Sequence, residues 1–367
     1  MRRGIDGQAE LLRGAPERLH DELAGLVDGV NPSSIYLVGC GDSHYCGLAA
    51  RFAIERWTGS GVEPLEALES SRYAIHTAPP DALVIAVSNS GEVARTIECL
   101  RFARQRGLRT LGITYNPDRR LAAAADEILQ YDCRDVGFAP GTMSYVASVL
   151  ALLVAGLRVA GETGALIDEQ VDNQLRTIEA TAQIMDATVA ACEKSAIAVA
   201  EQLTHDTQLF FLGGGPNYGT TRFAMAKMIE SSRHNSVEQE LEEWAHEQYF
   251  CTRPGTVTVV IAPPGVALDR AREQLQAVRD VGGTAVAVCR DDDEPTAELA
   301  DVVLPVVGQV SELLSPLVYC AATELVAYHF AVRNGKTMLG FDDEHRKEVN
   351  FRQIFRSHIP DRLLGLE

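Results

Sequence analysis

Basic residues are scarce in this sequence of 367 residues, with 33 Lys and Arg against 51 Asp and Glu and a formal net charge of −18. Only four of the basic residues are lysines. A protein that binds nucleic acid needs a basic face to displace counterions from the phosphates, so this composition argues against such a partner. The 46% hydrophobic and 23% charged content are those of an ordinary globular protein, which excludes a disordered chain.

Long apolar runs and paired cysteines are also missing. The most apolar stretch, residues 149–157, is about half of the roughly 20 residues that cross a bilayer, so we expect a buried helix there. No apolar run follows the two arginines near the N-terminus, which argues against a signal peptide. The eight cysteines are scattered, with no CxxC pair and no zinc-like spacing, as expected of reduced thiols. These absences predict a soluble cytoplasmic protein with no membrane segment.

The chain contains an internal repeat with an offset of about 174 residues. Four apolar segments of the first half recur in the same order in the second half, and most are rich in Val and Ile. The pairs are 35–38 with 209–212, 83–87 with 257–261, 110–114 with 284–288 and 126–129 with 301–304. Apolar runs that alternate with helical patterns are typical of a parallel sheet covered on both faces.

The repeat predicts an α/β fold with two tandem domains, each a doubly wound three-layer sandwich with a parallel sheet. Each repeat ends in a long apolar helix, over 144–160 and 317–333, and a polar helix over 167–200 joins the two. The expected organisation is an N-terminal helical segment 1–27, a first domain 28–162, a helical linker 163–195, a second domain 196–340 and a C-terminal tail 341–367.

Small polar residues follow the second predicted strand of the first repeat. The loop Ser88-Asn89-Ser90-Gly91-Glu92 leaves this strand and enters a predicted helix over 93–106. In open α/β sheets, ligands bind beyond the carboxyl ends of the strands, and hydroxyls beside the free N–H groups of a helix start suit a phosphate. The alternative interpretation is that Ser90 only caps the helix while Glu92 favours its dipole.

The second repeat helps to weigh these interpretations. Its equivalent turn, residues 261–265, has no hydroxyl group, whereas simple caps would be expected in both repeats. A single anion site retained in the first repeat explains the difference. The glycine loop 39–43 would lie alongside it and contribute Gly41 and Ser43. Neither glycine-rich loop completes the GxGxxG motif, so a nicotinamide site is the weaker interpretation.

At these residues the sequence resembles the tandem sugar-isomerase (SIS) domain family, in particular the isomerase half of glutamine–fructose-6-phosphate aminotransferases and the fructosamine-phosphate deglycases. The resemblance runs from Gly4 to about residue 345, and we expect no glutaminase domain before it. It implies two SIS domains, a sugar phosphate or amino-sugar phosphate as ligand, and no metal or organic cofactor. It also implies a homodimer, because in family members a histidine reaches the active site of the neighbouring subunit.

The resemblance assigns the ligand site residue by residue. The phosphate loop of the family is similar to 88–92, and its first glycine loop is similar to Cys40-Gly41-Asp42-Ser43. A family segment Ala-Ser-Thr-Lys is similar in place to 140–143, where Thr142 supplies the hydroxyl. Asp42 replaces a threonine, and its carboxylate would oppose a phosphate unless it is protonated or turned away. Otherwise Asp42 faces an amine or hydroxyl of a different substrate.

In the second repeat the resemblance places the lysine and the catalytic glutamate of the family on Lys227 and Glu230, and the ring-opening histidine on His246. Glu230 would move a proton between adjacent carbons, His246 would transfer the ring proton, and Lys227 would steady the enediolate. The alternatives are a solvent-exposed ion pair at i, i+3 spacing and a histidine beside the charged face of a helix around 238–243. His44 is a second candidate for the histidine.

The lysine that can form an imine in the synthases has no clean match, with Lys347 as the nearer candidate and Lys336 as the other. The resulting hypothesis is an enzyme that processes a sugar phosphate or amino-sugar phosphate as an isomerase, deaminase or deglycase. One alternative is a sugar-phosphate-sensing protein without catalysis. Another is a specialised biosynthetic enzyme that acts on a modified sugar.

Overall fold

The computed structural model describes residues 1–133, 137, 139–335 and 338–362, and its contacts divide the chain into two compact units. The first unit comprises residues 11–134, 143–179 and 343–367. The second unit comprises residues 1–10, 135–142 and 180–342. Each unit contains one sheet, and the long helix α9 (Asp168–Gln202) passes from the first unit to the second.

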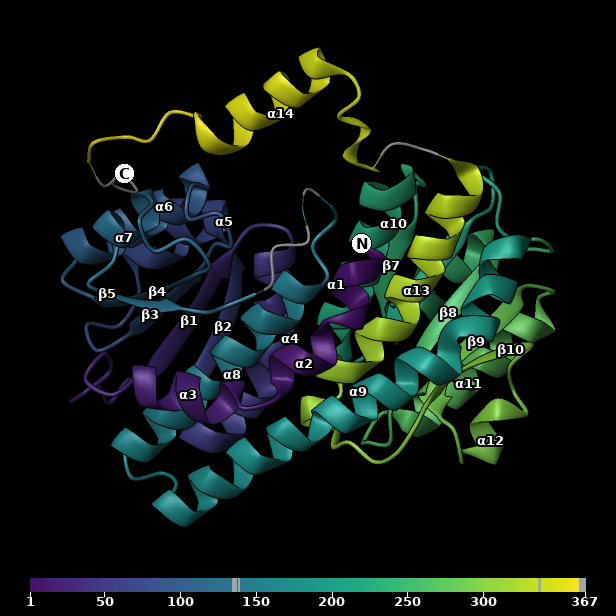
Figure 1. Ribbon diagram of the computed structural model, residues 1–367, viewed down its shortest axis with the longest axis horizontal. Coiled ribbons are helices and arrows are strands. Elements are labelled where there is room, and N and C mark those ends of the chain that lie inside the picture. Colours follow the sequence, from purple (N-terminus) through teal and green to yellow (C-terminus); the bar gives the residue numbers. More distant parts are fainter. Residues whose placement is uncertain (134–136, 138, 336–337, 363–367) are drawn as a thin grey trace. The chain divides into compact units, whose positions relative to one another are not determined.

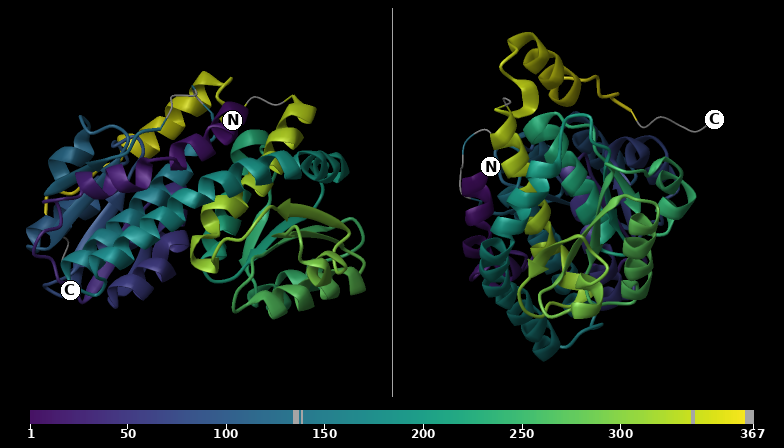
Figure 2. Two further views of the ribbon diagram at one scale, coloured as in Figure 1. Left: turned by 60° about the horizontal axis from the view of Figure 1, so that its bottom comes forward. Right: turned by 90° about the vertical axis from the view of Figure 1, so that its right-hand side faces the viewer.

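The sheet of the first unit has five parallel strands in the order β2-β1-β3-β4-β5 (Figure 1). The strands are β1 (Ser34–Gly39), β2 (Gly61–Glu66), β3 (Leu83–Val87), β4 (Arg109–Thr114) and β5 (Glu127–Gln130). The helices are α3 (Ala15–Glu22), α4 (Asp42–Thr58), α5 (Ala67–Arg72), α6 (Ala94–Gln105), α7 (Arg120–Ala124), α8 (Met143–Glu162) and α14 (Glu344–Phe355). The central strand β3 is buried along its whole length, and β1 and β4 are buried after their first residue, because helices cover both faces of the sheet (Figure 2).

The sheet of the second unit repeats this plan, with five parallel strands in the order β10-β9-β8-β6-β7. The strands are β6 (Leu209–Gly213), β7 (Val237–Glu240), β8 (Val257–Ala262), β9 (Thr284–Arg290) and β10 (Val302–Val306). The helices are α1 (Arg2–Asp6), α10 (Asn217–Ser232), α11 (Leu268–Asp280), α12 (Glu294–Ala297) and α13 (Pro316–Asn334), and α2 (Gln8–Leu12) crosses the boundary between the units. Read from β7 to β10, this order matches that of the first sheet read from β2 to β5.

The α/β class with two parallel sheets is confirmed, and the four predicted pairs of strands correspond to β1 and β6, β3 and β8, β4 and β9, and β5 and β10. The edge strands β2 and β7 were not predicted. The helix expected around 238–243 is wrong, because Val237–Glu240 forms β7 and Glu243–His246 forms the 3₁₀ turn η2. Most residues of β2 and β7 are exposed or only partly buried, so these two strands lack the continuous apolar run of the central strands.

Helix α8 has 20 residues and is the one described helix that is long and apolar enough to cross a membrane, and 89% of its most apolar window is buried. The helix is longer than the apolar run 149–157 suggested. A Cβ atom on Gly156 would lie 2.7 Å from Cγ1 of Ile54, so α8 packs closely on α4. The prediction of a buried helix is confirmed, because the apolar surface of α8 is covered by its own unit.

Candidate functional site

The strand order of the first sheet creates a topological switch point between β1 and β3. These strands are neighbours, with Val38 paired to Ala86, and the chain leaves them toward α4 and α6. In this strand order a crevice opens beyond the carboxyl ends at the switch point, and ligands bind there. The two loops that the sequence analysis singled out, 39–43 and 88–92, are the loops that follow these strands.

The loop 88–92, here called the serine loop, is held in a tight turn. The Ser88 N–H donates to the Ile113 carbonyl at 3.0 Å, and the Gly91 N–H donates to the Ser88 carbonyl at 3.0 Å. Gly91 has φ +67°, and a Cβ there would lie 2.8 Å from Cβ of Arg119. The turn therefore requires glycine at this position, both for its backbone angle and for the missing side chain.

Ser88 provides the least satisfied polar group of the loop. Its side chain is 1% exposed, and its Oγ has no hydrogen-bond partner within the described part of the chain. A buried hydroxyl without a partner loses its hydrogen bonds to water and gains none in the protein, which destabilises the fold by about 1–3 kcal/mol. Ser88 lies in the loop that follows the carboxyl end of β3, and its role toward an oxyanion stays a prediction.

Asn89 is oriented by a hydrogen-bonded chain beneath the loop. The Tyr131 hydroxyl donates to Oδ1 of Asn89 at 2.8 Å and accepts from the Ser148 hydroxyl at 3.2 Å. Burial raises the pKa of Tyr131, which keeps its hydroxyl protonated as a donor. Because Oδ1 is engaged, the NH₂ group of Asn89 is left as a donor.

The capping interpretation of Ser90 is wrong. Helix α6 begins at Ala94 with Val93 as its N-cap residue, and no side chain caps it. The Ser90 hydroxyl instead accepts from the Glu92 N–H at 3.2 Å, within the loop itself. The two serines therefore belong to a loop that ends before the helix, so capping does not account for them.

The glycine loop enters α4 directly. Gly41 has φ +56° and is the N-cap residue, so Asp42 and Ser43 stand in the first turn of the helix. An acidic residue is favourable there because it faces the positive end of the helix dipole. The side chain of His44 is buried, with Nδ1 3.4 Å from Oε1 of Glu66. The roles of Gly41, Asp42 and Ser43 toward a ligand stay predictions.

Thr142 and the C-terminal lysines are placed less directly. Thr142 is buried just before α8 and groups by its contacts with the second unit, and its role as a phosphate ligand stays a prediction. Lys347 lies on α14, where its Nζ is 3.3 Å from Oε1 of Glu344. Lys336 lies outside the described residues.

The residues after β4 also border this region, and the sequence motifs did not predict them. Asn116, Arg119 and Arg120 line an open pocket of about 690 Å³ together with Ser90 and Glu92, and the C-terminal residues Phe351, Phe355 and Arg356 complete its lining. Asn116 also donates through Nδ2 to the Asn89 carbonyl at 3.1 Å. The available signal was the polar run after the predicted strand 110–114, because β4 is the neighbour of β3.

The switch point of the second sheet is filled by the chain itself. It lies between the neighbouring strands β6 and β8. The Val266 N–H, in the loop after β8, donates to Oε2 of Glu312 at 3.2 Å, and a Cβ on Gly265 would lie 2.2 Å from Cδ of the same side chain. A Cβ on Gly215, in the loop after β6, would lie 3.9 Å from Oε1 of Glu312. A carboxylate of the 3₁₀ turn η4 (Glu312–Leu314) thus lies beside both loops.

Lys227 and Glu230 form an ion pair on α10, with Nζ 2.5 Å from Oε2. The side chain of Lys227 is 0% exposed and that of Glu230 is 32% exposed. The Lys227 ammonium also lies 4.9 Å from the centroid of the Phe223 ring, at the distance of a cation–π contact. The alternative of a solvent-exposed pair is wrong for Lys227, because only its partner reaches the surface.

His246 ends the turn η2, and its side chain is 65% exposed. Its Nε2 lies 3.5 Å from Oε1 of Glu242, whose other oxygen pairs with Arg270 at 2.5 Å. The hydrogen bond from Arg270 lowers the pKa of Glu242. The structure therefore joins His246 to Glu242, and its catalytic role stays a prediction. Across the described ranges, no group of three or more His, Cys, Asp or Glu side chains is placed to hold a metal ion.

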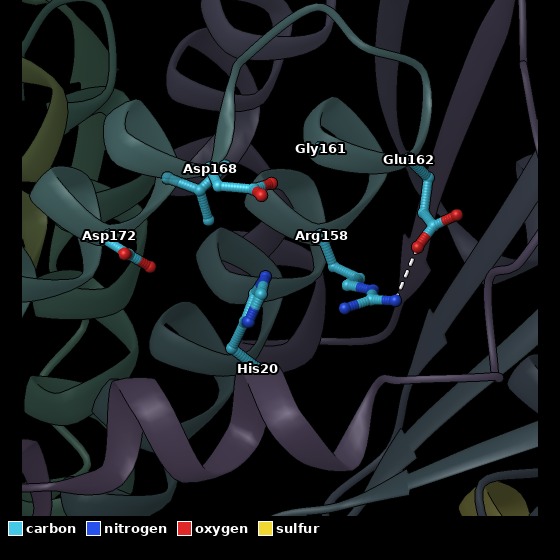
Figure 3. A pocket seen from close by; sticks show the side chains of 7 residues that line it. His20, Arg158, Gly161, Glu162, Asp168 and Asp172 are labelled. Carbon is cyan, nitrogen blue, oxygen red and sulfur yellow. Dashed lines mark hydrogen bonds and ion pairs between the residues drawn. The ribbon is translucent and has the colours of Figure 1, made fainter.

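A further cavity of about 340 Å³ in the first unit is lined by His20, Arg158, Glu162, Asp168 and Asp172, with Gly161 and Val171 (Figure 3). Helix α8 starts after the carboxyl end of β5 and runs back along the sheet, so its last turn, which carries Arg158 and Glu162, lies toward the amino edge. Ligands of open sheets bind at the opposite edge, so this cavity is not the counterpart of the serine loop.

Comparisons with known proteins show what the chain and its fold are similar to. Residues 30–158 match the family model described as the SIS domain. The chain is 28% identical over 306 residues to the isomerizing glutamine–fructose-6-phosphate aminotransferase of Gloeobacter violaceus, covering 82% of this chain and 49% of that protein. It is 29% identical over 316 residues to the enzyme of the same name from Synechocystis, covering 83% and 49%. The chain thus spans about half the length of these curated relatives.

Solved structures show the same fold. The C-terminal domain of glucosamine-fructose-6-phosphate aminotransferase from Francisella tularensis superposes with a TM-score of 0.80 at 21% identity, over 92% of this chain and 96% of that one. Glucosamine-6-phosphate deaminase from Thermotoga maritima superposes with a TM-score of 0.66 at 18% identity, over 90% and 95%. Both cover nearly the whole chain, including both sheets.

Proposed function

We propose that the chain is an enzyme of the SIS type acting on a sugar phosphate or amino-sugar phosphate, because residues 30–158 match the SIS-domain model. It would isomerise, deaminate or deglycate this substrate through ring opening and enediol proton transfer. Relatives of the chain are named for fructose 6-phosphate, and a structure of the same fold is named for glucosamine 6-phosphate. Those names support the substrate class and leave the particular sugar open to experiment.

The observation that carries the proposal is the hydroxyl of Ser88, which is buried in the loop after β3 and has no hydrogen-bond partner among the described residues. A phosphate oxygen there would accept from this hydroxyl, and the NH₂ group of Asn89 and the hydroxyl of Ser90 are further donors on the same loop. Hydrogen bonds to a charged acceptor contribute about 1.5–3 kcal/mol each. A few such donors hold a phosphate even in a chain whose net charge is −18.

Glu230 is the proposed base for proton transfer between C1 and C2. Its carboxylate is partly exposed, so a substrate can reach it, and its contact with Lys227 fixes its position. The Lys227 ammonium is held by burial and by the ring of Phe223, so it can stabilise negative charge that develops on the enediolate oxygen.

His246 and Lys347 are the proposed groups for ring opening and imine formation. Both lie in exposed ion pairs, with Glu242 and Glu344, and such pairs hold a side chain only weakly. An exposed histidine is what the shared active site of a homodimer requires, because its partner site lies on a second copy. We therefore propose a homodimer in which His246 completes the neighbouring site.

The test of the substrate class is a thermal-shift screen with fructose 6-phosphate, glucose 6-phosphate and glucosamine 6-phosphate, followed by NMR in deuterated water. A ligand at 100 times its Kd should stabilise the protein by about 2.7 kcal/mol. We expect stabilisation and incorporation of deuterium at C1 or C2. Binding without exchange would indicate a sensing protein. Binding of unphosphorylated sugars alone would indicate an enzyme of modified sugars.

The test of the shared site is complementation between two inactive variants, Glu230→Gln and His246→Gln. Random association of the two forms hybrids in about half of the dimers, each with one intact site, so about a quarter of the wild-type activity should return. Each variant alone is the control. Mixtures that remain inactive although hybrid dimers form would place both residues in the site of one subunit.

A further inference from the structure

The pocket beside the serine loop concentrates positive charge in an acidic protein. Three arginines, Arg119, Arg120 and Arg356, line it against one carboxylate, Glu92. The chain as a whole has 33 basic residues against 51 acidic ones, so this local excess runs against the composition. Its volume of about 690 Å³ is in the range of small-molecule sites, so it has room for more than a single phosphate.

Arg120 builds the pocket. Its Nε lies 2.6 Å from Oε2 of Glu92, and its other donors reach the carbonyl of Glu92 at 2.7 Å and the carbonyl of Phe355 at 2.6 Å. Phe355 is the last residue of α14, so the guanidinium satisfies a carbonyl that the end of the helix leaves open. Arg120 thereby ties the C-terminal segment to the serine loop.

The C-terminal segment is held at two further places in the first unit. Arg95 donates to the carbonyl of His358, and Gln105 donates to the carbonyl of Asp361 at 3.2 Å. The rings of Phe351 and Phe355 lie 5.5 Å apart and form the apolar part of the lining. This wall is therefore anchored to α6 and α7 by side-chain hydrogen bonds.

Arg119 and Arg356 remain available for a ligand. The Cβ of Arg119 packs against Gly91 of the serine loop, and across the described ranges its guanidinium makes no hydrogen bond or ion pair. Arg356 lies 3.0 Å from Glu348, but these side chains are 67% and 54% exposed. An exposed pair of this kind contributes about 0–1 kcal/mol, so an incoming anion can replace Glu348.

We infer that this pocket is a subsite for a second oxyanion on the substrate, recognised by Arg119 and Arg356. The substrate class is then a sugar phosphate with a carboxylate or another phosphate at the end remote from the phosphate that the serine loop holds. The inference rests on the proposed function, because it takes the first phosphate to lie on Ser88. Guanidinium groups suit this role because their planar donors match the two oxygens of a carboxylate or phosphate.

The test compares 6-phosphogluconate with sorbitol 6-phosphate by isothermal titration. Both are linear six-carbon phosphates, and they differ at C1, where one has a carboxylate and the other an alcohol. The wild type should bind 6-phosphogluconate about tenfold to a hundredfold more tightly, as expected for a charged hydrogen-bonded group. Arg119→Gln and Arg356→Gln should each reduce this preference and leave the affinity for sorbitol 6-phosphate within about twofold.

The control is Arg101→Gln, which removes the same charge from an exposed position on α6 and should leave the preference intact. Equal affinity of the wild type for both compounds would overturn the inference. An equal loss for both compounds in Arg119→Gln would also overturn it, because Arg119 would then hold the first phosphate. If Ser88→Ala changes neither affinity while Arg119→Gln still removes the preference, the serine-loop proposal fails and the arginine subsite stands.

Discussion

In the loop after β3 the buried hydroxyl of Ser88 has no hydrogen-bond partner in the described part of the chain, whereas the carboxylate of Glu312 lies beside the loops after β6 and β8. Both places have the same strand order and a glycine loop at the start of the following helix. The loop after β8 contains no hydroxyl and donates a backbone N–H to Glu312. The fold therefore forms two similar pairs of loops at its two switch points, and the side chain of Glu312 lies beside the second pair.

The helices that follow the glycine loops differ in the opposite sense. α10 carries Lys227 and Glu230, and at the offset of about 174 residues the corresponding positions on α4 are Ala53 and Arg56. The first repeat thus has the groups suited to anion binding, and the second repeat has the groups suited to proton transfer. The first three of the four predictions that follow test this division.

The largest effect is expected for Glu230→Gln. If the second unit supplies the base, turnover should fall by at least about 100-fold while the Kd for sugar phosphate stays nearly unchanged. The measurements are deuterium exchange at C1 or C2 and isothermal titration. The control is Glu298→Gln, an exposed glutamate in the same unit. Undiminished exchange in Glu230→Gln would remove proton transfer from this position.

Ser88→Ala should separate binding from stability. Loss of one charged hydrogen bond should weaken sugar-phosphate binding by about tenfold to a hundredfold. The melting temperature without ligand should not fall, because the hydroxyl has no partner to lose. Thr258→Val on β8 is the matched control, since it also removes a buried hydroxyl without a partner, in the other sheet. Equal weakening of binding in both variants would contradict the asymmetry.

Glu312→Ala should remove the carboxylate that lies beside the loops after β6 and β8. Without its carboxylate the Val266 N–H loses this partner, and because Val266 is exposed water can replace it, so the free energy of unfolding should fall by only about 0.5–1.5 kcal/mol. Inorganic phosphate should restore part of this loss in the variant and have a smaller effect in the wild type. Urea denaturation with and without phosphate measures both quantities, with Glu298→Ala as the control. An unchanged stability would show that Glu312 does not hold the loops together.

The smallest effect is expected for the dependence of folding stability on pH. Burial lowers the pKa of His234 in the second unit and of His20 in the first, from an ordinary value of 6.5. Below that pH the unfolded chain binds protons that the folded chain does not, so stability should be complete above about 6.5 and fall as the pH decreases. His234→Gln and His20→Gln should each flatten this slope, measured as melting temperature from pH 8 to 5. A slope that persists unchanged in the double variant would exclude both histidines.

The central strands and the serine loop could be predicted because their signals are local. A buried parallel strand is a run of Val and Ile, and the repeat showed which runs correspond. The edge strands β2 and β7 contain no such run, because most of their residues are exposed or only partly buried. Arg119 and Glu312 were missed for a different reason. Each contacts a loop that is distant in the sequence, with a separation of 46 positions in the case of Glu312 and Val266.

The sequence by itself determined that the chain forms two similar α/β sheets and that hydroxyls follow only one of the corresponding strands. The tertiary structure alone decided that the hydroxyl of Ser88 is buried without a partner and that Glu312 lies at the second switch point. It also showed that Lys227 is fully buried against Glu230. Hydrophobic periodicity can be read along a chain because strands and helices repeat locally. The satisfaction of a buried polar group cannot, because it depends on which distant segment packing brings within hydrogen-bond distance.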